Sequence, residues 1–246
     1  MDNLPEITDA ILKVGRSIPS KELFPTVVPE AAYLISSNPY AFTIGVCLDR
    51  GTKAEIIWTI PYDIKNELGD LDPNRIYQLS IIELEDLFNS LPRHPRYINA
   101  APRTLQELTR IVVEECDGNA SSIWSGKRAA EVNRTFQSIH GVGPGIANMG
   151  VLLIEAAFGI RFDDLDRIRM DIKPDVHTKR VLYRLGVSEA ETEVAALDAA
   201  RKLNPSYPGE VDGGLWWIGR NWCFASNPDC NNCPMHHSCS FWLDKS

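Results

Sequence analysis

The sequence has no apolar run that approaches the ~20 residues needed to span a membrane as a helix. It also lacks the basic start and long apolar stretch of a secretory signal, because acidic residues precede the short apolar segment near its beginning. Repeats and low-complexity segments are absent as well. We therefore expect an intracellular, cytoplasmic protein with no signal peptide and no membrane association.

An excess of positive charge is also missing. Lys and Arg number 25 against 33 Asp and Glu, so the formal net charge is −8. This balance excludes a wholly cationic nucleic-acid coat but leaves room for local basic patches that bind nucleic acid. With 246 residues, 44% apolar and 24% charged, the chain has the composition of one large or two small globular domains.

Alternating patterns typical of β-strands are scarce, whereas helical spacing of apolar residues recurs along the chain. Serine caps with a glutamate three residues later mark two helix starts, at Ser80 and Ser188. Gly15 and Gly186 suit helix C-caps. We predict an all-α fold, with residues 40–48 open to either a buried strand or a buried helix. The predicted helices are 5–14, 80–91, 104–116, 131–139, 146–158, 176–185 and 188–203.

Four of the six cysteines crowd near the end of the sequence with the spacing C-x6-C-x2-C-x5-C. Thiolates are soft ligands, and four of them suit either a [4Fe–4S] cluster or a zinc ion. The spacing alone leaves iron and zinc open. The predicted ligands are Cys223, Cys230, Cys233 and Cys239, while Cys47 and Cys116 lie in apolar contexts typical of core thiols.

A glycine-rich turn at residues 139–148 separates two of the predicted helices. Glycines allow a tight turn and a close approach to another molecule, and the amides of Gly143 and Gly145 would open the next helix as a phosphate site. Lys127, Arg128 and Arg134 make the local charge positive. The alternative is a plain helix–helix turn with no ligand.

A carboxylate follows this turn about thirty residues later, at Asp175 in Pro174-Asp175-Val176-His177. It is positioned to be the N-cap of the following helix, a role worth ~1 kcal/mol. Its other interpretation is a reactive carboxylate that faces a groove. Asp171, four residues earlier, is a competing carboxylate.

In their order along the chain, these three features resemble the helix-hairpin-helix DNA glycosylase superfamily, specifically its endonuclease III-like branch. The resemblance covers roughly residues 30–239 and implies two helical domains that flank a DNA-binding cleft. One is a six-helix barrel with the helix-hairpin-helix, residues 30–160. The other is an iron–sulfur cluster domain built from residues 1–29 and 161–246. The matching residues are His140-Gly141-Val142-Gly143, then Asp175, His177 and Arg180, then Cys223 to Cys239.

The resemblance also implies an activity and a set of site residues. It implies a DNA glycosylase of base excision repair that flips a damaged or mismatched base and cleaves its N-glycosidic bond. Asp175 would be catalytic, and the cysteines would hold a [4Fe–4S] cluster, with zinc the alternative. The expected partner is double-stranded DNA containing such a base, with a monomeric, nucleoid-associated enzyme. The implied DNA-binding residues are Gly141, Gly143, Gly145, Arg50, which falls where the family places a gap-filling glutamine, and His94 in a second loop.

The sequence departs from the family where bifunctional members carry a nucleophilic lysine. That position is Gly145, so we predict a monofunctional glycosylase with water as the nucleophile. Lys173 is the candidate for a bifunctional glycosylase and lyase that uses a non-standard lysine. A non-catalytic iron–sulfur DNA-binding protein and a zinc module remain alternatives. The charged stretch 161–173 is longer than expected, either as a solvated insertion or as part of the base pocket. The base itself is not specified by the sequence, and we favour deaminated or mismatched bases.

Overall fold

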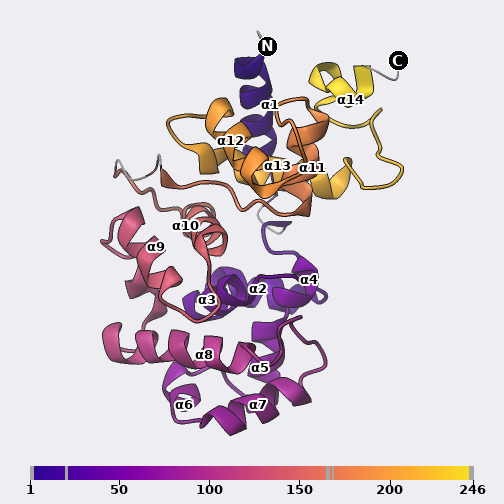
Figure 1. Ribbon diagram of the computed structural model, residues 1–246. Helices are drawn as coiled ribbons and strands as arrows, with labels where there is room; N and C mark the ends of the chain where they lie inside the picture. Colours follow the sequence, from indigo (N-terminus) through magenta and orange to yellow (C-terminus); the bar gives the residue numbers. More distant parts are fainter. Residues whose placement is uncertain (1–2, 20–21, 165–166, 168, 244–246) are drawn as a thin grey trace. The chain divides into compact units, whose positions relative to one another are not determined.

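The structure is a computed structural model that describes residues 3–19, 22–164, 167 and 169–243 (Figure 1). Throughout these residues the regular elements are helices, and no strand is present among them. The prediction of an all-α protein is therefore confirmed. No helix in the described part of the chain is long and apolar enough to cross a membrane.

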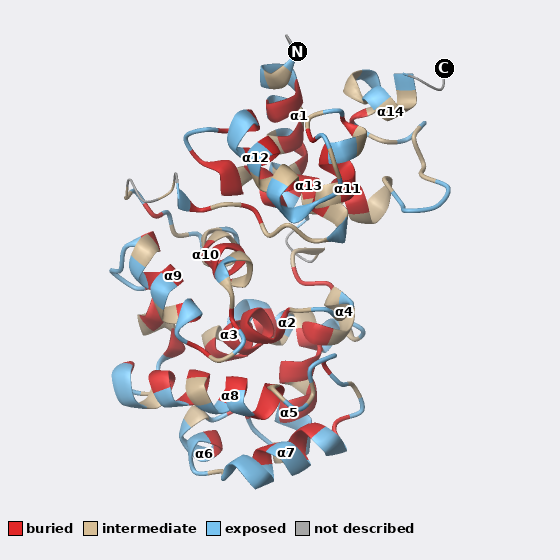
Figure 2. Cartoon of the chain, in the orientation of Figure 1, coloured by how far each residue is buried: buried red, intermediate tan, exposed pale blue. Residues whose placement is uncertain are grey.

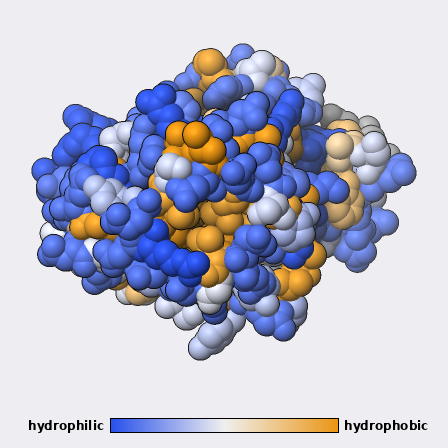
Figure 3. Space-filling view, turned by 90° about the horizontal axis from the view of Figure 1, so that it is seen from below, coloured by the Kyte–Doolittle hydropathy of each residue, from blue (hydrophilic) through white to orange (hydrophobic). Residues whose placement is uncertain are grey.

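The chain forms two compact units. One unit is Pro19–Phe162, and the other joins Met1–Ile18 to Asp163–Ser246. On the face in Figure 3, hydrophilic residues predominate around a central group of hydrophobic ones.

The unit Pro19–Phe162 is built around one buried helix, α3 (Pro39–Leu48). This helix settles the open prediction for residues 40–48 in favour of a helix, and every residue from Tyr40 to Leu48 is buried (Figure 2). Asn38 starts it by accepting hydrogen bonds from the amides of Tyr40 and Ala41, and Pro39 fixes the first turn. Because all its faces are covered, the helix has no polar face, and its sequence therefore shows no helical periodicity of apolar and polar residues.

Other helices of this unit pack around α3. Its direct neighbours are α2 (Pro29–Ser37), α5 (Ile60–Leu68), α8 (Ala101–Arg110) and α10 (Pro144–Phe158). The capping box predicted at Ser80 is present and starts α7. α8 continues directly into a π-helical turn. The remaining elements are α4 (Ala54–Ile57), α6 (Pro73–Tyr77), α7 (Ile81–Ser90), the π-helical turn Ile111–Glu115, the 3-10 turn Ala120–Ile123 and α9 (Ala129–Gln137).

The second unit packs the N-terminal helix against the C-terminal segment. α13 (Asp212–Asn221) lies against both α1 (Leu4–Arg16) and α11 (Val176–Arg184). The core of this second unit contains Ile11, Leu182, Leu215 and Ile218, all at most 1% exposed. The remaining elements are α12 (Glu193–Leu203), the 3-10 turns Pro208–Val211 and His236–Ser238, and α14 (Ser240–Leu243).

Two predicted helix boundaries in this unit are wrong, one C-cap and one N-cap. Gly15 lies inside α1, which ends at Arg16, and its place is explained by packing. A Cβ at Gly15 would lie 3.2 Å from the Gly214 amide nitrogen, and one at Gly214 would overlap the Ile11 carbonyl, so the two glycines let α1 and α13 approach closely. Ser188 is not an N-cap either, because its hydroxyl donates to the Ala190 carbonyl.

The cap that replaces Ser188 is Thr192, four residues later. Its hydroxyl accepts from the amide of Ala195 at the start of α12. Both residues suit a cap chemically, so only the path of the chain after Gly186 decides between them. Gly186 itself has a φ of +78°, as expected for the turn that ends α11.

The charged stretch 161–173 has no long helix within its described part. It is anchored by apolar side chains, because Phe162, Met170 and Ile172 are all buried. Asp166, one of its acidic residues, lies outside the described residues. The described part is thus more than a solvated charged insertion.

Candidate active site

Asp175 is the N-cap of α11, as the sequence predicts. Its Oδ1 accepts hydrogen bonds from the amides of His177 at 2.8 Å and Thr178 at 2.9 Å. Its Oδ2 makes no hydrogen bond or ion pair with any described residue, and the side chain is only half-buried. One carboxylate oxygen therefore holds the helix while the other is available for chemistry. The positive end of the helix favours a negative charge at this position.

The competing carboxylate, Asp171, is engaged elsewhere. Its two oxygens accept from Nε and a terminal nitrogen of Arg201 at 2.9 and 2.7 Å, a bidentate ion pair. Lys173, the candidate non-standard nucleophile, donates its backbone amide to Oδ1 of Asp212 at 3.0 Å. The geometry thus separates Asp175 from Asp171, which the sequence left as rivals.

The other two residues of the Asp-x-His-x-x-Arg pattern bind α11 to its neighbours. Arg180 is 8% exposed and donates to the carbonyls of Cys223 at 2.6 Å and Gly219 at 3.0 Å. It also lies 3.1 Å from Nδ1 of His177. Gly219 has no side chain because a Cβ there would lie 2.6 Å from the Cβ of His177. This pattern therefore fixes the helix that carries Asp175 on α13 and on the first cysteine.

All four predicted cysteine ligands line one pocket. Aromatic side chains form much of its remaining wall, from Trp222, Phe241 and Trp242. Burial, reinforced by the other three thiols, raises the pKa of Cys233 to about 11, and burial together with Cys223 and Cys230 raises the pKa of Cys239. Crowded thiols in an apolar pocket therefore stay protonated unless a metal cation compensates the negative charge of the thiolates. The donor set is therefore suited to a thiolate-bound metal group.

Arg184 closes one side of this pocket. One of its terminal nitrogens lies 3.4 Å from Sγ of Cys223 and 2.6 Å from the carbonyl of Phe224. Its guanidinium also lies 4.7 Å from the ring centroid of Phe241. Among the described residues, no three His, Cys, Asp or Glu side chains stand in position to hold a single metal ion.

The predicted hairpin connects α9 to α10. Gly141 has a φ of +78°, and Gly143 is the residue that precedes the first turn of α10. The amides of Gly143, Gly145 and Ile146 make no hydrogen bond to the described residues, since the first bond of the helix runs from Ala147 to the Gly143 carbonyl. Unpaired amides at a helix start are suited to bind an anion.

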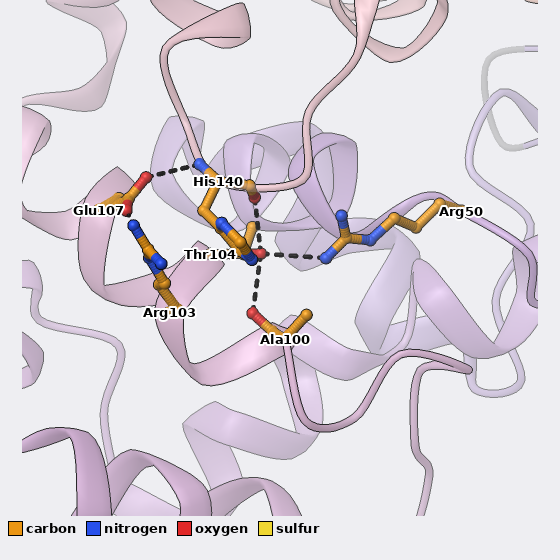
Figure 4. A network of polar contacts seen from close by, with 6 residues as sticks. All are labelled: Arg50, Ala100, Arg103, Thr104, Glu107 and His140. Atoms are coloured by element: carbon orange, nitrogen blue, oxygen red, sulfur yellow. Dashed lines mark hydrogen bonds and ion pairs between the residues drawn. The ribbon is translucent and has the colours of Figure 1, made fainter.

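Side chains from α8 hold the first half of this hairpin (Figure 4). Thr104 donates to the His140 carbonyl at 2.8 Å, and the His140 amide donates to Oε2 of Glu107 at 2.6 Å. Arg103 binds the other oxygen of Glu107 at 2.9 Å. Glu107 is not among the residues predicted for the site, although it lies in the predicted helix 104–116. A contact with a residue more than thirty positions away leaves no signal in local spacing.

The two predicted DNA-binding residues outside the hairpin differ in their surroundings. Arg50 donates from its two terminal nitrogens to the Gly141 carbonyl at 2.6 Å and to Thr104 at 3.2 Å. His94 is exposed, in a loop whose Arg93 approaches the buried carboxylate of Asp63 at 3.2 Å. His94 thus faces solvent, whereas Arg50 is already bound to the hairpin.

Comparisons with known proteins agree with these features. The chain is 24% identical to the endonuclease III of Bacillus subtilis over 97% of its length and 94% of that protein. It is 26% identical to the endonuclease III of Thermotoga maritima over 67% of its length and 68% of that protein. No family model matches the chain.

The fold is also that of solved structures of this kind. A trapped covalent intermediate of endonuclease III with DNA superposes with a TM-score of 0.65 at 19% identity, covering 98% of both chains. A thermostable thymine-DNA glycosylase superposes with a TM-score of 0.64 at 19% identity, covering 99% of this chain and 98% of that one. These comparisons confirm the resemblance to the endonuclease III-like branch of the helix-hairpin-helix DNA glycosylase superfamily.

Proposed function

We propose that this protein is a DNA glycosylase of base excision repair, which flips a damaged or mismatched base from double-stranded DNA and hydrolyses its N-glycosidic bond. The observation that carries the proposal is Asp175, whose Oδ2 is unpaired at the start of α11 while Asp171 is fully engaged by Arg201. The similarity to endonuclease III proteins supports the same activity.

In this reaction the base leaves with the bonding electron pair, and positive charge develops on the sugar. The carboxylate of Asp175 stabilises that charge through Oδ2 and orients the attacking water. Its Oδ1 stays bound to the amides of His177 and Thr178, so the side chain is already oriented before DNA binds. Water supplies the hydroxyl group to the sugar carbon, and the departing base takes up a proton.

The position of the family's nucleophilic lysine is Gly145, in the first turn of α10. Because glycine offers no amine, we propose a monofunctional enzyme that leaves an intact abasic site. The alternatives are a bifunctional glycosylase and lyase that uses Lys173, and a non-catalytic iron–sulfur protein that only binds DNA.

We propose that the hairpin binds a DNA phosphate through the unpaired amides of Gly143, Gly145 and Ile146. Gly141 gives the turn its left-handed residue. Lys127, just before α9, and Arg134, within it, are exposed and positively charged, and we propose that the exposed His94 also contacts the duplex. We further propose that the enzyme acts as a monomer on cytoplasmic, nucleoid DNA.

We propose that the cysteine pocket holds a [4Fe–4S] cluster, as the resemblance implies, with zinc the alternative. One zinc ion with Zn–S bonds of about 2.3 Å needs its four sulfurs about 3.8 Å apart. A cube of four irons takes one thiolate at each of four corners and so needs the ligands spread more widely. The four cysteines line one pocket, and the similarity to endonuclease III proteins supports a cluster there. A bound cluster would supply a structural cross-link between the four cysteines.

The test is a base-release assay on single-lesion duplexes that contain uracil, mispaired thymine, oxidised pyrimidines, alkylated purines or deaminated purines. Each product is divided, and half is treated with hot alkali. We expect strand breaks only after alkali, and a loss of about 10²-fold or more in Asp175→Asn. Asp171→Asn is the matched control and should keep its activity, because it removes only the ion pair with Arg201.

Each contrary result identifies one alternative. Strand breaks without alkali would contradict the monofunctional proposal and point to Lys173. Full activity in Asp175→Asn would remove Asp175 from the mechanism. Binding of every duplex with no base release would favour the non-catalytic protein.

A further inference from the structure

The guanidinium group of Arg50 lies against the hairpin (Figure 4). Arg50 follows α3, and its two terminal nitrogens reach different groups. One donates to the Gly141 carbonyl at 2.6 Å, and the other donates to the Thr104 hydroxyl at 3.2 Å. Thr104 in turn contacts the His140 carbonyl at 2.8 Å. The guanidinium therefore connects three segments that are far apart in the sequence.

These contacts divide the polar groups of the hairpin into two sets. The carbonyls of His140 and Gly141 and the His140 amide are all bound to side chains of the protein. The amides of Gly143 and Gly145, a few residues on, have no partner among the described residues. The side that would face a phosphate is thus left free while the opposite side is held.

The backbone at Gly141 leaves room for this arrangement. Its φ of +78° favours glycine, and a Cβ at this position would overlap the guanidinium of Arg50. The carbonyl carries the negative end of the local dipole, so the adjacent cation neutralises it and keeps the potential of the hairpin positive. The absence of a side chain at Gly141 and the presence of Arg50 are therefore parts of one contact.

A second loop also lies close to Arg50. The guanidinium lies 5.4 Å from the ring centroid of Tyr97, and that of Arg96 lies 5.9 Å from the same ring. The Arg96 amide donates to the Thr52 hydroxyl at 2.7 Å, which ties this loop to the one that carries Arg50. Burial lowers the pKa of Arg50 from its ordinary value, although a guanidinium stays protonated at neutral pH.

We propose that Arg50 is a positioning residue that holds the hairpin in its phosphate-binding conformation, and that it does not enter the duplex to fill the gap left by a flipped base. The inference rests on the proposed function for its ligand, which is a DNA phosphate. Entry into the duplex would require Arg50 to give up its bonds to Gly141 and Thr104. Its loss should therefore weaken binding to damaged and undamaged DNA alike.

The test measures Kd by fluorescence anisotropy, at one fixed salt concentration, for an undamaged duplex and for the same duplex with a tetrahydrofuran abasic analogue. For Arg50→Met we expect both Kd values to rise by the same factor, about tenfold, as for the loss of one charge-assisted hydrogen bond. Arg50→Lys should recover part of the loss, because an ammonium group can reach one acceptor but not two. Arg110→Met removes the same charge from the far end of α8 and should change either Kd less than about threefold.

Hydrogen exchange in the free protein supplies a readout that needs no DNA. Arg50→Met should speed exchange in the peptide that covers residues 139–147 and leave that of α3 unchanged. Thr104→Val, which removes the shared hydroxyl but keeps the volume, should produce a smaller change in the same peptide. It also provides a second variant if Arg50→Met does not fold.

Two outcomes would overturn the inference. One is a rise in Kd confined to the abasic duplex, which would assign Arg50 to the gap. The other is unchanged exchange of the hairpin in both Arg50→Met and Thr104→Val. If the wild type binds neither duplex, the proposed function fails, and the exchange experiment still decides whether Arg50 holds the hairpin.

Discussion

At the scale of single residues, two chemically identical side chains differ in role because they have different hydrogen-bond partners. Asp175 and Asp171 are four positions apart, yet one uses a single oxygen to cap a helix and the other is bound at both oxygens by an arginine. A carboxylate with one fixed and one open oxygen is both oriented and accessible. The cap and the catalytic interpretation of Asp175 are therefore compatible, because they use different atoms.

Asp63 provides a pH-dependent test at the same scale. Its carboxylate is 4% exposed, and burial raises its pKa despite the nearby Arg93, which lowers it. An unfolded aspartate has a pKa of about 3.9, so above this pH the native state holds its proton longer than the unfolded state does. The contribution of Asp63 to stability therefore falls as the pH rises from about 4 through the native pKa.

We expect the free energy of unfolding of the wild type, minus that of Asp63→Asn, to decrease as the pH rises above about 4 for this reason. Urea unfolding at several pH values measures it. A difference that rises with pH would mean that Arg93 outweighs burial at this carboxylate.

At the scale of elements, α11 is the helix on which the candidate chemistry depends. It carries Asp175 at its start, Arg180 in its middle and Arg184 at its end. The two arginines bind the backbone of the segment that begins the cysteine loop, at Cys223 and Phe224. Hydrogen bonds within one unit thus join α11 to the start of the cysteine loop. The cysteine loop therefore supports the helix that begins at Asp175.

Arg180→Met should be strongly destabilising, because the buried carbonyl of Gly219 and the partly buried carbonyl of Cys223 would lose their donor. At 1–3 kcal/mol for each unsatisfied group, we expect a loss of about 3 kcal/mol. Thermal unfolding measures it, and Arg16→Met is the matched control. Arg16 pairs with Glu210 in the same unit while 72% exposed, so its removal should cost about 1 kcal/mol or less. Equal losses in the two variants would contradict the role given to Arg180.

At the scale of the whole molecule, the candidate functions are distributed over two compact units. The hairpin and Arg50 belong to Pro19–Phe162, whereas Asp175 and the four cysteines belong to the other unit. A net charge of −8 is compatible with the proposed phosphate binding by the hairpin, because binding through backbone amides needs few cationic side chains. Because all four cysteines lie in one unit, loss of a cluster should affect that unit more than the other.

Cys230→Ser should lower the iron content and destabilise only the unit that contains α1 and α11. We expect faster hydrogen exchange in α1, α11 and α13, with exchange in α3 and α10 unchanged. Cys116→Ser, which replaces a buried thiol in the other unit, is the control and should keep the iron content of the wild type. Bound zinc in place of iron would contradict the cluster, and uniform loss of protection in both units would contradict their independence.

Much of this protein could be predicted from local sequence. The all-helical class, the capping box at Ser80 and the cap at Asp175 follow from side chains that act within four residues of themselves. The spacing of the four cysteines also predicts a shared site, because all four lie within one short segment of the chain. Helix ends were less predictable: Gly15 suits a C-cap, and its real role in packing against Gly214 depends on a helix two hundred residues away.

Other assignments were decided only by the tertiary structure, because their causes lie far along the chain. Residues 40–48 have no polar face, so only the helices packed around them distinguish a buried helix from a buried strand. The choice of Asp175 over Asp171 depends on Arg201, thirty positions from Asp171. The contact of Arg50 with Gly141 joins residues ninety-one positions apart. The sequence by itself determined which residues are candidates for the chemistry, and folding decided which atoms of those residues remain free.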